Sequence, residues 1–308
     1  MKVFIDGKTG TTGLNIYSRL SQRDDVELIT LSEELRHDAS ARSEALNSAD
    51  YVFLCLPDDA AREAVSMIHN PDTVVIDAST AHRTNADWAY GLPELDGTFM
   101  EKLRTSKRIA VPGCHASGFI TLVYPLVKNG IISADENLHC FSLTGYSGGG
   151  KKMIAEYESE DRSPLLSAPR HYALAQQHKH LKEMKAIAGI EKEPAFCPVV
   201  ADFYSGMLVT ITLFKSQLGS KTVDDVIDGY KSLYTTDIVK YIDGVDEAGF
   251  LSAAALSGKD SMQISVFGNE ERVLLAARYD NLGKGACGAA LECLNISSGA
   301  DEKLGLVL

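Results

Sequence analysis

The sequence predicts an α/β protein whose N-terminal part is a doubly wound, mostly parallel sheet and whose C-terminal part is an α+β domain with a mixed sheet. Three observations support this prediction. Short apolar runs alternate with helical segments in the first third of the chain, as in parallel sheets that are buried on both faces. Beyond about residue 115 the strands cluster and partly alternate, which favours antiparallel or mixed pairing. The length of 308 residues is typical of two domains.

The expected elements follow from hydrophobic periodicity. In the first domain we predict strands at 2–5, 26–31, 51–56, 74–77 and 109–111, with helices that end at Leu20 and span 60–69. In the second domain we predict helices at 119–128 and 223–233 and strands at 139–144, 198–203, 207–214, 263–267 and 272–278. A small-residue helix, 286–294, is expected to pack on the first domain. We therefore assign residues 1–114 and 285–308 to the first domain and 115–284 to the second.

The composition argues against several classes of function. The formal net charge is −12 and no run is rich in lysine and arginine, which argues against nucleic acids and anionic membranes as partners. No apolar run has the length of a transmembrane helix, and the N-terminus lacks the apolar core of a signal peptide. The six cysteines form no CxxC pair, so we expect reduced thiols, a cytoplasmic protein and no metal site.

A glycine-rich loop, Gly7-Lys-Thr-Gly-Thr-Thr-Gly13, lies between the first strand and the first helix. This is the context of a dinucleotide-binding fingerprint, because glycines let the backbone approach a pyrophosphate at a helix N-terminus. The spacing is GxxGxxG rather than GxGxxG, and a purely structural turn is the alternative. We predict a Rossmann-type domain in which the loop contacts the cofactor through Gly7, Thr9, Gly10, Thr11, Thr12 and Gly13.

The segment after the second strand indicates which dinucleotide binds. Sites for NAD place an acidic residue there for the ribose 2′-hydroxyl, whereas an arginine favours the 2′-phosphate of NADP. Ser32 and Arg36 suit NADP, while Glu33 keeps NAD open. We therefore predict NADP. Pro57 and Ser79 are expected to contact it too, because open α/β sheets bind ligands at the carboxyl ends of their strands.

The stretch Ile109–Leu122 contains a candidate nucleophile. An apolar strand meets Pro112-Gly113, and Cys114 then precedes a long apolar segment. If that segment is a helix, its N-terminal N–H groups and dipole stabilise a thiolate, lower the pKa of the thiol and support an oxyanion beside the sulfur. The alternative is a cysteine packed as a small hydrophobe. The position of Cys114 at the same predicted sheet edge as the glycine loop favours the nucleophile.

Two polar loops supply candidate substrate contacts. Arg83 follows the strand at 74–77, and a run of glycines around 148–150 leads to Lys151. Backbone donors and cations in such loops suit an anionic ligand, so we predict that substrate contacts Arg83, Ser147, Gly148 and Lys151. A flexible linker is the alternative for the second loop.

Histidines gather between Tyr172 and Glu183. On a helix, His178 and His180 would diverge by about 200°, so they could not both face one site. Glu183 lies three residues after His180 and could orient it as a general base. A solvated polar face is the alternative.

These motifs occur in an order that is familiar from one family. The glycine loop, the Pro-Gly-Cys turn, the Ser-Gly-Gly-Gly-Lys loop, a His-x-His-x-x-Glu run and an Asp-Asn-Leu-x-Lys-Gly-Ala segment follow one another, with Asp77-Ala-Ser-Thr-Ala-His-Arg83 and Gly91-Leu-Pro-Glu-Leu95 between them. From Met1 to the last helix, the chain resembles the N-acetyl-γ-glutamyl-phosphate reductases of arginine biosynthesis, of the shorter type.

The resemblance implies an NADPH-dependent enzyme that reduces N-acetyl-glutamyl 5-phosphate to N-acetylglutamate 5-semialdehyde and releases phosphate. It implies Cys114 as a nucleophile that forms a thioester, and a histidine that transfers a proton. The family pattern Tyr-x5-His-x-His-x-x-Glu is carried onto Tyr172, His178, His180 and Glu183, with His180 slightly favoured as the acid/base. Tyr172 and Glu183 are expected at the substrate, and Asn281 at the cofactor. A homodimer or homotetramer is also implied.

The chain departs from the family beside the nucleophile. The family usually has Asn-Pro-Gly-Cys-Tyr, whereas this chain has Val111-Pro-Gly-Cys-His115. We expect His115 to replace an aromatic wall; tuning the thiolate or touching the acyl phosphate are the alternatives.

Three other functions explain parts of the sequence. Aspartate-semialdehyde dehydrogenases resemble this chain in fold, but they typically have Asn rather than Gly before the cysteine. A non-catalytic dinucleotide-binding regulator is expected to lack Cys114 or the histidines, and none is missing. A cysteine hydrolase would need no glycine loop at residue 7. The acyl-phosphate reductase therefore explains most of the sequence.

Overall fold

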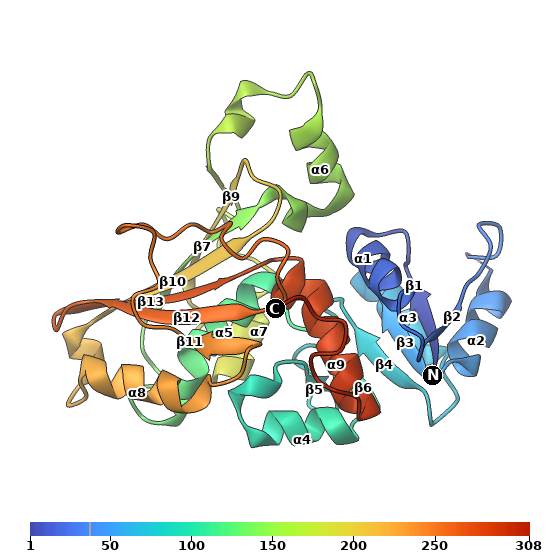
Figure 1. Ribbon diagram of the computed structural model, residues 1–308, viewed down its shortest axis with the longest axis horizontal. Helices are drawn as coiled ribbons and strands as arrows, with labels where there is room; N and C mark the ends of the chain where they lie inside the picture. Colours follow the sequence, from blue (N-terminus) through green and yellow to red (C-terminus); the bar gives the residue numbers. More distant parts are fainter. Residues whose placement is uncertain (37) are drawn as a thin grey trace. The chain divides into compact units, whose positions relative to one another are not determined.

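A computed structural model describes residues 1–36 and 38–308 (Figure 1). The chain forms two compact units. The first unit comprises Met1–Pro93, Gly97–Pro112 and Ala289–Leu306. The second unit comprises Glu94–Asp96, Gly113–Gly288 and Val307–Leu308. Within the described residues, no helix is both long enough and apolar enough to span a membrane.

The first unit is built on a six-stranded sheet with the strand order β2-β1-β3-β4-β6-β5, in which every paired neighbour is parallel. The strands are β1 (Lys2–Asp6), β2 (Glu27–Ile29), β3 (Tyr51–Leu54), β4 (Val74–Asp77), β5 (Ala89–Tyr90) and β6 (Arg108–Ala110). Its helices are α1 (Thr11–Leu20), α2 (Ala39–Ser48), α3 (Asp58–Ser66), α4 (Gly97–Thr105) and most of α9 (Gly288–Ser298). This arrangement confirms the predicted parallel-sheet domain.

The central strands of this sheet are buried on both faces, as their continuous apolar sequences require. All four residues of β4 are buried, and so are Val52, Phe53 and Leu54 of β3. Strand β3 ends at Leu54, two residues earlier than expected, because Pro57 is the N-cap of α3. The C-terminal helix α9 lies in this unit, where Asn295 accepts a hydrogen bond from Arg23 at 2.7 Å.

The second unit contains a seven-stranded mixed sheet with the order β11-β12-β13-β10-β7-β9-β8. The pairs β7·β9 and β11·β12 are parallel and the others are antiparallel. The strands are β7 (His139–Gly145), β8 (Arg170–His171), β9 (Ala195–Ala201), β10 (Met207–Phe214), β11 (Val239–Tyr241), β12 (Met262–Gly268) and β13 (Arg272–Tyr279). The helices are α5 (Cys114–Lys128), α6 (Gly150–Glu158), α7 (Leu181–Ala188) and α8 (Val223–Leu233). The predicted mixed-sheet domain is confirmed.

Strand β10 shows how the sheet divides its two faces. Met207, Val209, Ile211 and Leu213 are at most 1% exposed, whereas the side chains between them become more exposed toward Phe214. This is the alternation expected from the sequence. Helix α5 packs against β10 and β13. Eleven of its fifteen residues are buried, so α5 is the central helix of this unit.

Two expectations about helices need correction. The helix expected at 119–128 begins five residues earlier, at Cys114, directly after the Pro112-Gly113 turn. The helix expected from residue 286 is preceded by a π-helical turn, Gly283–Cys287, before α9 begins.

Residues 172–180 lie outside any helix, and α7 starts only at Leu181. The helical restriction on His178 and His180 therefore does not apply.

Candidate active site

The glycine loop of the first unit has the geometry that a bound pyrophosphate needs. Gly7 has φ +86°, and a Cβ there would lie 2.3 Å from the carbonyl oxygen of Cys55. A Cβ at Gly13 would lie 2.5 Å from the carbonyl oxygen of Gly7. Gly10 is the N-cap of α1. Side chains are thus excluded from the space before the helix N-terminus, where Thr11, Thr12 and Gly13 begin α1.

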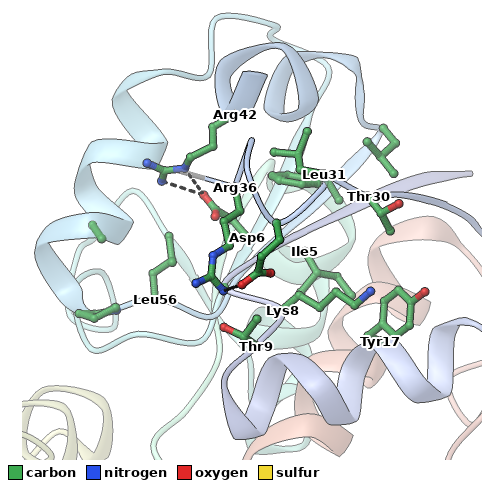
Figure 2. A pocket seen from close by; sticks show the side chains of 16 residues that line it. Ile5, Asp6, Lys8, Thr9, Tyr17, Thr30, Leu31, Arg36, Arg42 and Leu56 are labelled. Atoms are coloured by element: carbon green, nitrogen blue, oxygen red, sulfur yellow. Dashed lines mark hydrogen bonds and ion pairs between the residues drawn. The ribbon is translucent and has the colours of Figure 1, made fainter. Parts of the chain in front are cut away.

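A cavity of about 450 Å³ opens beside this loop (Figure 2). Four of the predicted cofactor residues line it: Gly7, Thr9, Arg36 and Pro57. Its other lining residues come from the ends of β1, β2 and β3 and from α1, α2 and α3. Ser32 and Ser79 are not among the lining residues. The glycine cradle and this cavity fit a dinucleotide, since the adenosine half of such a ligand lies beyond the first two strands.

Sequence reasoning missed several polar residues of this cavity. Asp6, at the end of β1, accepts a 2.9 Å hydrogen bond from Arg42 of α2, and both side chains are largely buried. The ammonium nitrogen of Lys8 lies 3.3 Å from the ring centroid of Tyr17, and Figure 2 shows the two side chains together. Lys8 could have been noticed, because it is the one cation inside the glycine motif.

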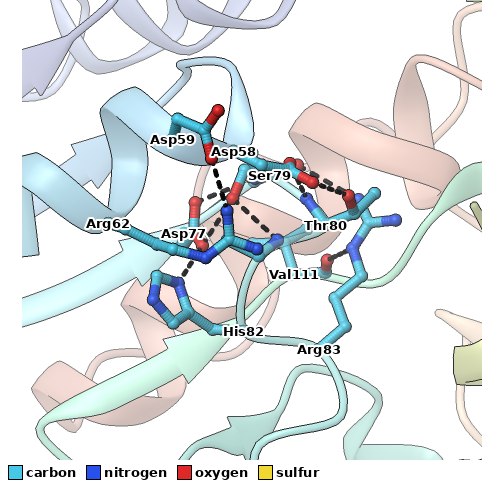
Figure 3. Close-up of polar contacts among 11 residues, drawn as sticks. Asp58, Asp59, Arg62, Asp77, Ser79, Thr80, His82, Arg83 and Val111 are labelled. Carbon is cyan, nitrogen blue, oxygen red and sulfur yellow. Dashed lines mark hydrogen bonds and ion pairs between the residues drawn. The ribbon is translucent and has the colours of Figure 1, made fainter.

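A buried network follows β4 (Figure 3). Asp77 is fully buried; its carboxylate accepts from the Ser79 hydroxyl at 2.7 Å and lies 2.6 Å from Nδ1 of His82. The ring of His82 stacks on Trp88 at 4.0 Å between centroids. This network fixes the loop after the strand. The hydroxyl of Ser79 is held by it.

Arg83 lies at the end of the same loop. Its guanidinium donates to the carbonyl oxygens of Val111 at 2.9 Å and Ala78 at 3.1 Å (Figure 3). Both acceptors are main-chain atoms, which ties the end of β4 to the segment after β6. Arg83 thus supports the strand ends, and its predicted contact with substrate stays a prediction.

In the second unit, Cys114 is the first residue of α5, with Gly113 as N-cap. Its side chain is half-buried. The first turn of a helix presents unpaired N–H groups and the positive end of the dipole, so an anionic sulfur is favoured at this position. The helix start that the nucleophile hypothesis needed is present.

His115 follows the nucleophile and is only 2% exposed. Its Nδ1 lies 2.6 Å from the hydroxyl of Ser142, and its Nε2 lies 2.5 Å from the hydroxyl of Tyr172. Burial, and then the charges of His178 and Lys179, lower the pKa of His115 to about 3. We expected His115 only to replace an aromatic side chain that packs beside the site. Its neutral ring also forms hydrogen bonds with two hydroxyl groups, so packing is only part of its role.

Tyr172, the partner of His115, is influenced by the candidate nucleophile. Its pKa is raised by burial first and by the charge of Cys114 second, so its hydroxyl stays protonated. A neutral hydroxyl anchored by His115 can donate to an oxygen that develops charge next to Cys114.

The remaining predicted residues of the histidine run lie together. The rings of His178 and His180 are 4.6 Å apart, and that of His115 lies 5.8 Å from the first and 5.7 Å from the second. Glu183 is 2% exposed; its Oε1 lies 3.9 Å from Nε2 of His180. Its Oε2 accepts from the N–H of Gly113 at 3.2 Å, so this carboxylate joins the histidine to the turn before Cys114. Among the residues described, no three His, Cys, Asp or Glu side chains are placed to hold a metal ion.

The glycine-rich loop of this unit is held by Asn281. The amide of Asn281 donates to the hydroxyl of Ser147 at 3.0 Å and accepts from the N–H of Gly206 at 2.9 Å. Ser147 is buried, whereas Gly148 and Lys151 are exposed. Asn281 thus fixes the loop that carries the predicted substrate residues, and its contact with cofactor stays a prediction.

Taken together, the second unit contains a candidate nucleophile, candidate proton-transfer groups and hydroxyl donors, and the first unit contains a glycine cradle that fits a dinucleotide. This combination is that of a dehydrogenase that works through a covalent thioester.

Family models agree with this combination. Residues 32–103 match the model described as "Semialdehyde dehydrogenase, NAD binding domain", and residues 114–281 match "Semialdehyde dehydrogenase, dimerisation domain". The structure is similar to aspartate semialdehyde dehydrogenase II from Vibrio cholerae, solved with ASA, with a TM-score of 0.74 and 16% identity over 97% of this chain and 98% of that one. At this identity the likeness concerns the fold. The chain belongs to the semialdehyde dehydrogenase family.

Curated relatives narrow the assignment. "N-acetyl-gamma-glutamyl-phosphate reductase" from Trichormus variabilis is 42% identical over 99% of both chains. "N-acetyl-gamma-glutamyl-phosphate reductase 2" from Pseudomonas putida is 42% identical over 97% of both. Within its family, the chain therefore belongs with the N-acetyl-gamma-glutamyl-phosphate reductases.

Replacement of His115 by Phe should change how stability depends on pH. Because the pKa of His115 is about 3 in the folded protein and about 6.5 when unfolded, stability is full above pH 6.5 and is lost as the pH falls toward 3. Between pH 7 and pH 5, H115F should lose about 2 kcal/mol less unfolding free energy than the parent protein. Urea unfolding at both pH values measures this difference.

The matched control is His139→Phe, since His139 is an exposed histidine of the same unit. H139F should keep the parent pH dependence. At pH 7, H115F should also be less stable by about 1–3 kcal/mol, because two hydroxyl groups lose their partner. An unchanged pH dependence in H115F would contradict the neutral state of this ring.

Replacement of Arg36 by Ala should weaken the binding of NADPH more than the binding of NADH. Arg36 lines the cavity and forms an exposed 2.9 Å ion pair with Glu33. Loss of a hydrogen bond to a charged phosphate corresponds to about 1.5–3 kcal/mol, or about 10- to 100-fold in KM for NADPH. Arg62→Ala is the control, because Arg62 forms an equivalent 2.9 Å pair with Asp59 but lies outside the cavity lining. Equal KM values for NADPH in R36A and R62A would sink the assignment.

Proposed function

We propose that this protein reduces N-acetyl-L-glutamyl 5-phosphate to N-acetyl-L-glutamate 5-semialdehyde, with NADPH as reductant and release of phosphate, in arginine biosynthesis. The observation that supports it most is Cys114 at the first residue of a buried helix, beside the Tyr172, His180 and Glu183 cluster. The relatives that share 42% identity over nearly the whole chain carry this activity in their names.

The chemistry begins at the sulfur. The Cys114 thiolate attacks the carbonyl carbon of the acyl phosphate, the carbon–oxygen bond to phosphate breaks, and a thioester forms. Tyr172 and the N–H groups at the start of α5 stabilise the oxyanion of this step. NADPH, when bound, supplies the hydride that reduces the thioester carbon. The carbon–sulfur bond then breaks to give the aldehyde, and the thiolate is regenerated.

We assign two proton transfers to His180: it takes the proton that the Cys114 thiol loses before the attack, and it exchanges the proton on the oxygen of the thiohemiacetal before the carbon–sulfur bond breaks. Glu183 lies 3.9 Å from its Nε2 and also accepts from Gly113, so the histidine is tied to the nucleophile turn. His178 has a different contact, because its Nδ1 accepts from the main-chain N–H of His180 at 3.2 Å. We infer that His178 holds the segment and that His180 exchanges the proton.

The remaining residues take supporting roles in this proposal. We assign cofactor binding to the glycine loop with Ser32, Arg36, Pro57, Ser79 and Asn281. Substrate binding falls to Arg83, Ser147, Gly148, Lys151, Tyr172 and Glu183. NADP binding is assigned to 1–114 with 285–308, and catalysis and oligomerisation to 115–284. The exposed face of β10 supports a homodimer or homotetramer. A cytoplasmic location is supported by the six cysteines, none of which forms a disulfide.

Replacement of Cys114 by Ser should abolish turnover and leave NADP binding intact. The assay is the reverse reaction: N-acetylglutamate semialdehyde, phosphate and NADP are mixed, and the absorbance of reduced cofactor is followed. The parent protein should show phosphate-dependent reduction, and C114S should fall by at least about a thousandfold. Cys197→Ser, at a half-buried cysteine of β9, should retain activity. Full activity in C114S would refute the assignment of Cys114 as the nucleophile. Reduction of NADP with aspartate semialdehyde would refute the assigned substrate.

The two histidines should respond differently to substitution by glutamine. H180Q should lose about 10²- to 10⁴-fold in kcat, the usual contribution of general acid–base catalysis, and its pH–rate profile should lose one limb. H178Q should lose much less and keep the profile, because the role assigned to His178 is structural. A flattened profile in H178Q with a normal one in H180Q would reverse the assignment.

A further inference from the structure

Helix α5 receives hydroxyl groups from three buried tyrosines. Tyr234 donates to the carbonyl oxygen of Thr121 and Tyr230 to that of Leu122, each at 2.6 Å. Tyr279, at the end of β13, donates to the carbonyl oxygen of Cys114 at 2.5 Å. All three phenol groups are at most 2% exposed. These contacts have different causes along the helix.

The contact at Thr121 repairs a break in the helix. Pro125 lies four residues later and has no N–H, so the Thr121 carbonyl has no donor within the helix. Tyr234 provides the missing donor. Because an unsatisfied buried carbonyl is costly, this hydroxyl is needed for stability.

The contact at Cys114 repairs nothing. The residue four positions after Cys114 is Gly118, which has an N–H that an α-helix would direct at the Cys114 carbonyl. The Gly118 N–H also donates to the Tyr279 hydroxyl at 3.0 Å, and the same hydroxyl donates to the carbonyl oxygen of Cys114. The tyrosine thus contacts both backbone groups of the first residue pair that lies inside α5. Its effect is on the geometry of the turn.

The surroundings keep this bridge in place. A Cβ at Gly118 would lie 2.7 Å from the Tyr279 hydroxyl oxygen, so only glycine leaves room for the bridge. On the other side, a Cβ at Gly285 would lie 3.1 Å from the Cβ of Cys114. Tyr279 and Gly285 belong to one continuous segment that leaves β13 and enters the π-helical turn. That segment contacts the nucleophile residue at its carbonyl and leaves little room for a side chain between Gly285 and the Cys114 Cβ.

We propose that Tyr279 is a positioning residue for the nucleophile: its hydroxyl holds both ends of the first turn of α5 and thereby sets where the sulfur of Cys114 points. The inference rests on the proposed role of Cys114. Burial, and then the charge of Cys114, raise the pKa of Tyr279 well above its ordinary value, so the hydroxyl remains a donor when the thiolate forms.

The test compares Tyr279→Phe with Tyr234→Phe, which each remove one buried hydroxyl from the same helix. We would measure kcat and KM, the thermal midpoint, and the rate at which iodoacetamide alkylates Cys114 as a function of pH, read at the Cys114 peptide by mass spectrometry. Y279F should lose about tenfold or more in kcat with KM within about twofold. Its alkylation curve should move to higher pH. Y234F should keep kcat and the curve but have the lower thermal midpoint.

Two outcomes would overturn the proposal. One is a Y279F variant with the parent kcat and alkylation curve. The other is a loss of kcat that follows the loss of stability equally in both variants. If Y279F does not fold, Gly118→Ala displaces the hydroxyl without removing it and should show the same effects. Alkylation needs no substrate, so it still reports on Tyr279 even if C114S proved active and the proposed function failed.

Discussion

The central constraint on this structure is that a helix buried on nearly all sides must find partners for every backbone polar group. Helix α5 has eleven buried residues of fifteen and contains Pro125. Water cannot satisfy the Thr121 carbonyl that Pro125 leaves open, and the second unit supplies the hydroxyl of Tyr234, from the segment after α8, instead. Because its backbone polar groups have partners, the helix can be buried, and its N-terminus presents Cys114 from a rigid element.

Around that N-terminus, the polar side chains are mostly neutral or locally balanced. His115 is uncharged because it is buried, and Tyr172 keeps its proton for the same reason. Glu183 is the buried carboxylate of the cluster, with the Gly113 N–H on one oxygen and His180 near the other. A thiolate at Cys114 thus faces donors more than competing anions. In the first unit, the charge of the buried Asp6 carboxylate is likewise balanced locally, by an ion pair with Arg42.

The sequence predicted elements well where periodicity and end signals agree. Strand β10 and helix α8 have the predicted bounds, and α8 begins with a capping box at Thr222. The Pro-Gly turn and apolar run indicated Cys114 as a candidate nucleophile, although the helix that it begins was expected to start five residues later. The glycine spacing predicted the cradle at Gly7, because positions where the backbone approaches closely need glycine and are therefore visible in the sequence.

Other features have no local signature. Residues 172–180 include good helix formers, but Ala173 and Gln176 have positive φ, and the amide of Gln176 pairs with both main-chain groups of Phe196. Tertiary hydrogen bonds thus override the propensity of the segment. The bond between His115 and Ser142 spans 27 residues, and the Asn281 amide bonds across 134 residues to Ser147. No pattern within one window of sequence could reveal these partners.

The bridge at the start of α5 also bears on how the chain acquires its structure. Tyr279 lies 165 residues after Cys114, and Tyr234 lies 113 residues after Thr121. Contacts of such separation close large loops and form late, because their entropic cost precedes any gain. A growing polypeptide that has emerged only as far as α8 holds the cysteine but lacks the phenol that completes its turn. The surroundings of the Cys114 thiol are therefore completed last, when nearly the whole chain has been synthesised.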